Sequence, residues 1–253
     1  MAEGRVDFEQ RGHIGIAFID NPAKKNALSL PVFRDLVKIL DDFEQDENIR
    51  FLILTSRGDH FSTGVDIEGI DDPVSVKARV DLFNKAIFQM EKIPKPVLAA
   101  VRGYAFGGGF ELALACDMIV ASEKAVFSLP EAMLGAYAGF AVIRLHEVVG
   151  RLKAKELLMT CKRVSAAEAE KIGLVNKVVS DDELMNEAIS IAEDVSKKGP
   201  LSIQVAKASV NRDLGGIDFE YMKAIQVNIG GSEDLREGVK AFFERREPQF
   251  KGR

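Results

Sequence analysis

Three consecutive glycines near the middle of the chain, Gly107-Gly108-Gly109, stand directly before Phe110 and Glu111. Glycine has no side chain to keep a ligand away, so backbone N–H groups at these positions are able to approach a bound oxygen closely. The residues from Phe110 to Cys116 are predicted to form a helix, whose N-terminus carries a partial positive charge. Glu111 lies in the first turn of that helix. This stretch is therefore predicted to stabilise a developing negative oxygen beside an acid or base.

A short apolar run, Val97–Val101, precedes these glycines and is typical of a fully buried strand. Residues 102–106 are predicted to turn from that strand towards the helix. Strands alternate with helices along the first part of the chain, which indicates parallel pairing with the helices packed outside. The predicted strands are 6–10, 13–19, 51–55, 97–101, 118–121 and 125–128, and the predicted helices are 30–43, 73–91 and 110–116.

Helices predominate after Gly150, interrupted at 173–179. They are predicted at 152–159, 166–172, 181–196, 201–212, 219–227 and 232–245. The chain has no internal repeat and no long linker. We expect one structural unit with a core over residues 1–195 and a helical C-terminal region over residues 196–253.

Composition narrows the function classes. A chain of 253 residues is long enough to bury a large core, and a net charge of −5 gives no electrostatic footprint for nucleic acid. No apolar run approaches the roughly 18 residues of a membrane span, and the N-terminus does not resemble a signal peptide. Two cysteines, Cys116 and Cys161, make no disulfide framework, and three scattered histidines predict no metal site. We expect a cytoplasmic protein without nucleic-acid or membrane partners.

Several segments occur in a characteristic order over nearly the whole chain. They read FSTGVDI at 61–67, PVLAAVRGYAFGGGFELA at 96–113, CD at 116–117, FSLPEAMLG at 127–135, GLV at 173–175 and REGVKAF at 236–242. Together they resemble the enoyl-CoA hydratase/isomerase (crotonase) superfamily, and most of all its enoyl-CoA hydratases. The resemblance implies an α/β fold, a crotonase-like spiral of β-β-α repeats with a helical C-terminal trimerisation region. It also implies a homotrimer or a dimer of trimers.

The same resemblance implies an acyl-CoA thioester substrate, as in fatty acid metabolism, and no cofactor beyond the coenzyme A that the substrate carries. By position, the backbone N–H groups of Val65 and Gly108 would form the oxyanion hole, and Val65 is bulkier than the family's usual small residue. Lysine suits phosphate oxygens. Taken alone, Lys24 and Arg245 would be ordinary surface charges. The positions implied to contact coenzyme A or the substrate are Ala23, Lys24, Ala27, Thr63, Gly64, Asp66, Ile67, Gly107, Phe242 and Arg245.

Two glutamates twenty positions apart, Glu111 and Glu131, match the catalytic pair of hydratases within this family. Two carboxylates at one small site are able to deprotonate a water while protonating a carbon, which addition of water across a conjugated double bond requires. The leading hypothesis is therefore hydration of a 2-enoyl-CoA to a 3-hydroxyacyl-CoA. Two alternatives remain open: double-bond isomerisation or another crotonase-type acyl-CoA reaction, and a non-catalytic protein of this fold that binds RNA or protein.

The segment after Glu131 departs from the family pattern. Residues 136–145 read AYAGFAVIRL, where relatives have a Pro, a glycine-rich turn and a Thr-Gln-Arg-Leu helix start. Phe140, Val142 and Ile143 are bulkier than their usual counterparts, and we expect them to fill space close to Glu131. The choice between hydration and isomerisation is predicted to depend on Glu131 and this segment beside it.

Overall fold

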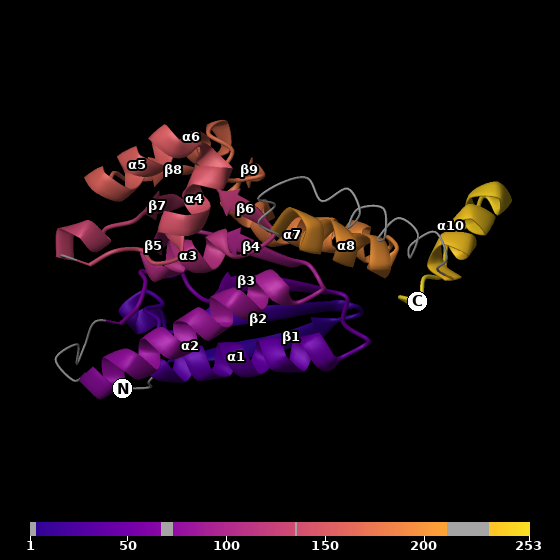
Figure 1. The fold of residues 1–253 in the computed structure, drawn as a ribbon, viewed down its shortest axis with the longest axis horizontal. Helices are drawn as coiled ribbons and strands as arrows, with labels where there is room; N and C mark the ends of the chain where they lie inside the picture. Colours follow the sequence, from indigo (N-terminus) through magenta and orange to yellow (C-terminus); the bar gives the residue numbers. More distant parts are fainter. Residues whose placement is uncertain (1–3, 67–72, 135, 212–232) are drawn as a thin grey trace.

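Two β-sheets form the centre of the protein, and helices cover the larger sheet on both faces (Figure 1). The structure, a computed structural model, describes residues 4–66, 73–134, 136–211 and 233–253. The larger sheet has the order β1-β2-β3-β4-β6-β9, and the smaller sheet has the order β5-β7-β8. The strands of the larger sheet are β1 (Arg5–Arg11), β2 (Ile14–Asp20), β3 (Phe51–Ser56), β4 (Val97–Val101), β6 (Met118–Ser122) and β9 (Lys177–Val179). The smaller sheet holds β5 (Tyr104–Phe106), β7 (Val126–Ser128) and β8 (Val164–Ser165).

Parallel pairing prevails in the larger sheet, as the alternation of strands and helices predicts. Strands β1 and β2 form an antiparallel hairpin, and every later pair from β2 to β9 is parallel. In the smaller sheet β5 and β7 are parallel, whereas β7 and β8 are antiparallel. The chain passes from the larger sheet to the smaller one between Val101 and Tyr104, so the segment that follows β5 begins where the two sheets meet.

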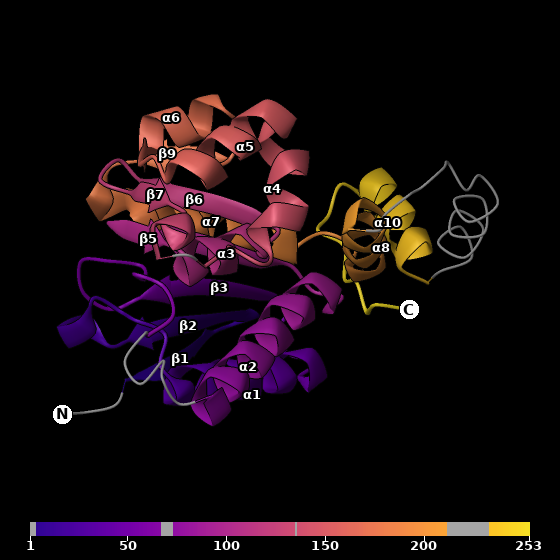
Figure 2. The ribbon, with the colours of Figure 1, turned by 60° about the vertical axis from the view of Figure 1, so that its left-hand side comes forward.

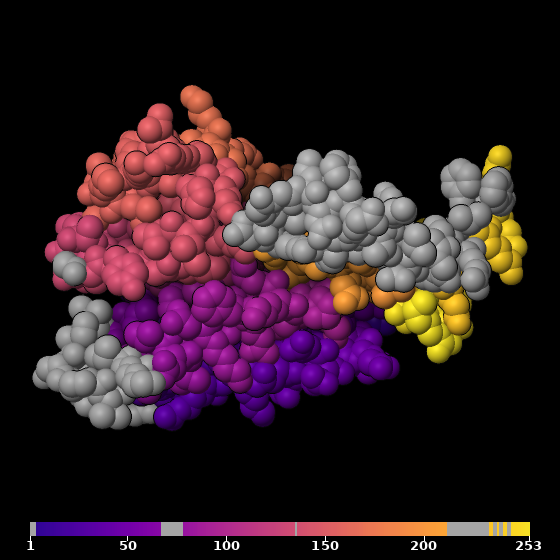
Figure 3. Space-filling model, viewed as in Figure 1, coloured from indigo at the N-terminus to yellow at the C-terminus, as the bar shows by residue number. Residues whose placement is uncertain are grey.

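The helices are α1 (Leu30–Gln45), α2 (Pro73–Lys92), α3 (Gly108–Leu114), α4 (Ala141–Val149), α5 (Arg151–Thr160), α6 (Ala166–Lys171), α7 (Leu184–Ser196), α8 (Pro200–Asn211) and α10 (Glu233–Glu244). Short 3-10 turns form η1 (Pro22–Lys24), η2 (Glu131–Leu134) and η3 (Asp181–Glu183). Helices α8 and α10 extend from one end of the body, away from the two sheets (Figures 1, 2 and 3). None of the described helices combines the length and apolar character that crossing a membrane requires.

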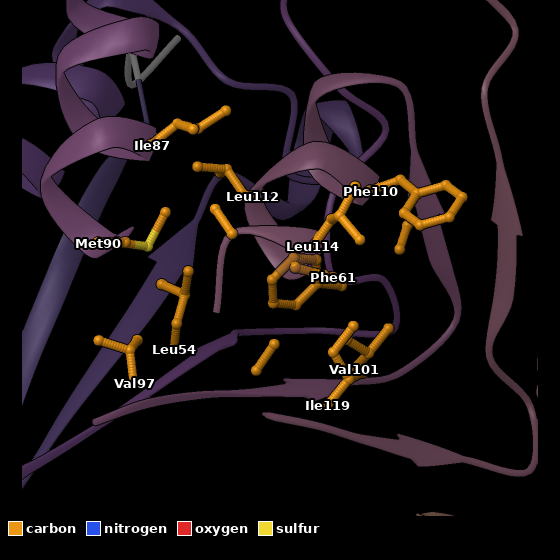
Figure 4. Close-up of a cluster of buried hydrophobic side chains, with 14 of the residues drawn as sticks. Leu54, Phe61, Ile87, Met90, Val97, Val101, Phe110, Leu112, Leu114 and Ile119 are labelled. Carbon is orange, nitrogen blue, oxygen red and sulfur yellow. The ribbon is translucent and has the colours of Figure 1, made fainter. Parts of the chain in front are cut away.

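Buried side chains on the central strands alternate between two hydrophobic cores. Leu52 and Leu54 of β3 face the core beneath α1, α2 and α3, whereas Phe51 and Ile53 face the core beneath α7. Both faces of these strands are covered, which is why they are apolar without interruption. Figure 4 shows part of the first core, where Phe110, Leu112 and Leu114 of α3 lie close to side chains of β3 and β4. This packing fixes the helix that carries Glu111.

Most of the predicted elements occur within a few residues of their expected bounds. The predicted turn at 102–106 contains the short strand β5, and the predicted helix at 181–196 begins as the 3-10 turn η3 before α7. Helix α4 was not predicted, although it supplies part of the site described below. The helix predicted at 219–227 lies outside the described residues.

Candidate active site

The N-terminus of α3 is in close contact with the loop that follows β3. Gly107 precedes the helix with φ 51° and ψ −126°, a conformation that favours glycine, and its N–H donates to the Ser128 carbonyl at 2.9 Å. A Cβ at Gly109 would lie 2.7 Å from the Cβ and the carbonyl oxygen of Ser62. Glycine is therefore required at both ends of the triplet, once for conformation and once for close approach.

The loop after β3 brings Val65 beside the start of α3. A Cβ on Gly64, whose φ is 98°, would lie 3.2 Å from the Gly108 nitrogen. On its other side the loop pairs with Leu28, whose N–H donates to the Gly64 carbonyl at 2.8 Å and whose carbonyl accepts from the Asp66 N–H at 3.0 Å. Among the described residues, neither the Val65 N–H nor the Gly108 N–H has a hydrogen-bond acceptor. Both N–H groups are able to donate to a ligand.

Apolar side chains flank the Gly108 N–H. A Cβ on Gly108 would lie 3.0 Å from Cγ2 of Val65 and 3.3 Å from the ring of Phe83, which α2 contributes. Phe83 packs edge-to-face on Phe33 of α1, with ring centroids 5.6 Å apart. An apolar surrounding lowers the local dielectric and strengthens a hydrogen bond to a charged oxygen.

Asn26 fixes the position of the loop after β3, and sequence reasoning did not single it out. Its buried side chain donates to the carbonyl oxygens of Arg57 at 2.7 Å and His60 at 2.6 Å. Its own carbonyl accepts from the Ser62 hydroxyl at 2.7 Å. The backbone of Asn26 has φ 58°, which asparagine tolerates better than most residues. A local sequence signal existed, because Asn in a polar loop often caps neighbouring backbone groups.

Glu111 of α3 is buried, with 3% of its surface exposed. Its carboxyl group contacts the N-terminus of a second helix, α4. Its Oε1 accepts from the N–H of Phe140 at 2.7 Å and from the N–H of Ala141 at 3.0 Å, at the start of α4. Burial raises the pKa of Glu111 from 4.5 to about 7, the two N–H groups act to lower it, and the charge of Glu131 raises it further. The carboxyl group is therefore poised to exchange a proton near neutral pH.

Glu131 is the first residue of η2, and it lies on the other side of Gly107. Its Oε1 would be 2.8 Å from a Cβ on Gly107, whereas its Oε2 is buried without a hydrogen-bond partner among the described residues. Burial also raises the pKa of Glu131. The two glutamates interact electrostatically, as the effect of Glu131 on Glu111 indicates. The structure thus brings together both predicted carboxylates and both predicted N–H donors.

Most of the residues implied to contact coenzyme A form a second group beside this site. The segment with Ala23, Lys24 and Ala27 lies against the loop after β3, because the Thr63 N–H donates to the Lys25 carbonyl at 3.2 Å. Lys24 forms an ion pair with Asp66 at 3.1 Å. Gly64 and Gly107 join this group to the oxyanion donors. A ligand crossing from Lys24 to Gly108 would follow the loop after β3.

Two of the predicted positions are not brought to this site within the chain, and a third lies outside the described residues. Phe242 lies on α10 and Arg245 lies directly after it, and α10 stands at one end of the molecule, well apart from α3 in the body (Figures 1 and 2). Ile67 lies outside the described residues. The remaining predicted site residues all lie at or near the junction of the two sheets.

The unusual segment at 136–145 forms the start of α4. Of the three bulky residues expected to fill space near Glu131, Phe140 is buried, whereas Val142 and Ile143 are among the exposed large hydrophobic residues. Val142 and Ile143 therefore do not pack into the protein interior, whereas Phe140 does. The N–H groups of Phe140 and Ala141 were also missed as partners of Glu111, since backbone donors leave no mark in side-chain identity.

Comparisons with known proteins agree with this geometry. The family model for enoyl-CoA hydratase/isomerase matches residues 9–253. The chain is 35% identical to a short-chain-enoyl-CoA hydratase of Clostridium acetobutylicum, with all of both chains covered, and 34% identical to a crotonyl-CoA hydratase of Syntrophomonas wolfei, with 99% of each covered. A crystal structure of enoyl-CoA hydratase from Bacillus anthracis superposes with a TM-score of 0.92 at 33% identity, covering 99% of this chain and 100% of that one.

A spiral α/β fold, with two adjacent carboxylates and paired N–H donors at the start of a glycine-led helix, defines a crotonase-like protein. The chain belongs to the enoyl-CoA hydratase/isomerase family.

Proposed function

We propose that this protein is an enoyl-CoA hydratase, a hydro-lyase that adds water to a 2-enoyl-CoA thioester. The observation that carries the proposal is the pair of buried carboxyl groups, Glu111 and Glu131, beside two N–H groups that have no acceptor among the described residues. The names of the relatives at about one-third identity support the same reaction.

In the proposed reaction the thioester oxygen accepts hydrogen bonds from Val65 N–H and Gly108 N–H. These donors stabilise the enolate-like oxygen that forms as water adds, and losing one such donor commonly costs about 3 kcal/mol of transition-state stabilisation. The side chains of Val65 and Phe83 keep this region apolar. No cofactor is needed beyond the coenzyme A moiety, because the chemistry consists of proton transfers and one carbon–oxygen bond.

The two carboxyl groups move the protons. A water held between Glu111 and Glu131 loses a proton to one carboxylate as its oxygen bonds to C3 of the substrate. The C2 carbon receives a proton from the other carboxyl group, so one water is added and the protonation of the pair is restored on release. A pKa of about 7 for Glu111 makes both protonation states accessible at neutral pH. The unpartnered Oε2 of Glu131 is a group that such a water would satisfy.

Hydration of crotonyl-CoA, followed as loss of the absorbance of the conjugated thioester, tests the proposal. We expect turnover by the natural protein and a loss of about 100-fold or more in kcat for Glu111→Gln and for Glu131→Gln. Glu123→Gln, at an exposed turn, is the matched control and should retain full activity. Absence of hydration on enoyl-CoA esters of any chain length would refute the proposal.

Double-bond isomerisation is the alternative outcome of the same variants. One well-placed carboxylate suffices to shuttle a proton between two carbons. If Glu131→Gln kept most of its turnover on a 3-enoyl-CoA while Glu111→Gln lost it, the protein would be an isomerase. Salt-sensitive RNA binding without any thioester chemistry would instead identify a binding protein of this fold.

We also propose that the protein acts in the cytoplasm as a homotrimer or a dimer of trimers. The free thiols of Cys116 and Cys161 suit a reducing compartment. The position of α10 beyond the body of the protein leaves Phe242 and Arg245 able to approach a neighbouring subunit instead of their own site. Light scattering coupled to size exclusion would measure the mass of the assembly, and a monomer would refute this part of the proposal.

A further inference from the structure

Arg144 lies one helical turn after the two N–H groups that hold Glu111. Its own backbone N–H donates to the Phe140 carbonyl at 3.1 Å and so closes the first turn of α4. The Nε of Arg144 donates to both carboxylate oxygens of Glu91 at 3.2 Å, and Nη2 also contacts Glu91 Oε2. The turn that presents hydrogen-bond donors to Glu111 is therefore tied by a side chain to the end of α2.

The Arg144–Glu91 pair is partly buried and joins three helices. The exposed fractions of the two side chains are 22% and 16%. Nη2 of Arg144 also donates to the Asn211 carbonyl at 3.1 Å, and Nδ2 of Asn211 donates to the Glu91 carbonyl at 3.0 Å. Helices α2, α4 and α8 thus meet at one set of charge-assisted hydrogen bonds, which have a more defined geometry than single exposed ion pairs.

A positive charge in the first turn of a helix opposes the helix dipole. Its presence at Arg144 therefore calls for a compensating interaction, which Glu91 supplies. A second partner, Glu147, receives Nη1 at 2.9 Å, but its side chain is 48% exposed and lies on α4 itself, three residues further along. Glu147 therefore ties Arg144 to nothing outside its own helix. Of the side-chain contacts that Arg144 makes among the described residues, those with Glu91 and Asn211 are the ones that tie α4 to other helices.

We infer that Arg144 is a positioning residue for catalysis, which acts through Glu91 to hold the N-terminus of α4 against the Glu111 carboxylate. This inference rests on the proposed hydration. Phe140, Ala141 and Leu145 pack the same helix into the core, so the fold does not depend on Arg144 alone. What the pair adds is the alignment of two N–H groups, and small misplacements of such groups have large effects on rate.

The consequence is measurable as a shift in proton affinity. Hydrogen bonds from backbone N–H groups stabilise the ionised carboxylate, so weaker bonds raise the pKa of Glu111 above its present value. The other charged group that acts on Glu111 is Glu131 on η2, and it is unchanged by substitutions at Arg144 or Glu91. On α4 and α2, Arg144, Glu147 and Glu91 are engaged with one another.

The test compares Arg144→Gln, Glu91→Gln and Arg144→Lys by the pH dependence of kcat for crotonyl-CoA hydration. We expect the acidic limb to move upward by about 0.5 to 1 pH unit in the two glutamine variants, with kcat at pH 7 reduced roughly tenfold and KM changed less than kcat. Arg144→Lys keeps the positive charge but loses the paired donors of the guanidinium group. Its pH profile and kcat are therefore expected to lie between those of the natural protein and those of Arg144→Gln. Glu147→Gln removes the exposed partner of the same guanidinium and should leave the profile unchanged.

A second measurement separates this inference from the proposed function. Titration of the Glu111 carboxyl carbon by NMR in protein labelled with ¹³C-glutamate reports its pKa without any substrate, and Glu111→Gln assigns the signal. If the natural protein hydrates nothing, the proposed function fails while the titration still tests the positioning. An unchanged Glu111 titration in folded Glu91→Gln and Arg144→Gln, with only a lower unfolding temperature, would overturn the inference and leave Arg144 a purely structural residue.

Discussion

Replacing Glu111 with glutamine is expected to stabilise the fold above neutral pH while removing activity. The folded protein raises the pKa of this carboxyl group from 4.5 to about 7, chiefly by burial. One pKa unit corresponds to about 1.4 kcal/mol, so the difference amounts to about 3 kcal/mol of unfolding free energy. Glutamine has the shape of the protonated acid, and its Oε1 retains the ability to accept from Phe140 and Ala141.

The sign of this effect follows from proton binding. Because the folded state holds the proton of Glu111 more tightly than the unfolded chain, the stability associated with this group is fully present below about pH 4.5. That stability is lost progressively as pH rises to about 7, and above that pH the whole amount is gone. Glu111→Gln is therefore expected to match the natural protein near pH 4 and to exceed it by about 3 kcal/mol near pH 8.5.

Urea unfolding at the two pH values, followed by circular dichroism, measures this difference. The comparison between variant and natural protein isolates Glu111 together with its interaction with Glu131, because the more distant titrating groups contribute to both. Glu123→Gln removes one carboxylate from an exposed turn and should show no comparable pH-dependent gain. A Glu111→Gln protein that is less stable at pH 8.5 than the natural one, or whose difference does not vary with pH, would refute the assignment of a buried, high-pKa carboxyl group.

Two other predictions follow from close contacts in the structure. In Gly107→Ala, the new Cβ would lie 2.8 Å from Oε1 of Glu131 at a backbone φ of 51°, so kcat for hydration should fall at least tenfold and stability by about 1 to 3 kcal/mol. In Lys207→Met, loss of the 2.8 Å ion pair leaves the half-buried carboxylate of Asp117 without its cation, and urea unfolding should register a loss of about 3 kcal/mol.

A matched substitution serves as the control for each of these two variants, Gly107→Ala and Lys207→Met. Gly12→Ala introduces a side chain at φ 59° with no heavy atom within 4 Å, so it should show backbone strain without loss of kcat. Lys198→Met removes an exposed ion pair with Asp194, and a change below about 1 kcal/mol is expected. Equal losses of kcat in the two glycine variants, or equal losses of stability in the two lysine variants, would contradict the respective arguments.

Local sequence patterns predicted the structural features that depend on residues close together in the chain. The uninterrupted apolar runs of β3 and β4 predicted strands buried on both faces, and the glycines before Glu111 predicted a close approach at the start of α3. These features depend on residues adjacent in the chain. The pairing of Glu111 with Glu131 came from the family resemblance, and the structure brings both to one site.

The features that were missed depend on contacts between distant segments. The donors of Glu111 are the backbone N–H groups of Phe140 and Ala141, which any residue type other than proline could supply. The outward orientation of Val142 and Ile143 follows from the rotation of α4, which its packing on the core through Leu145 determines. No pattern within ten residues of Glu111 contains that information.

The hydrogen bonds of Glu111 also have a consequence for synthesis of the chain. The carboxylate emerges from the ribosome about thirty residues before the N–H groups of Phe140 and Ala141 that receive it. In the unfolded chain, Glu111 is solvated and ionised at neutral pH. Burial of Glu111 therefore couples folding to uptake of a proton, which acid favours and alkali opposes, while the two N–H groups of α4 partly offset this effect by favouring the ionised carboxylate.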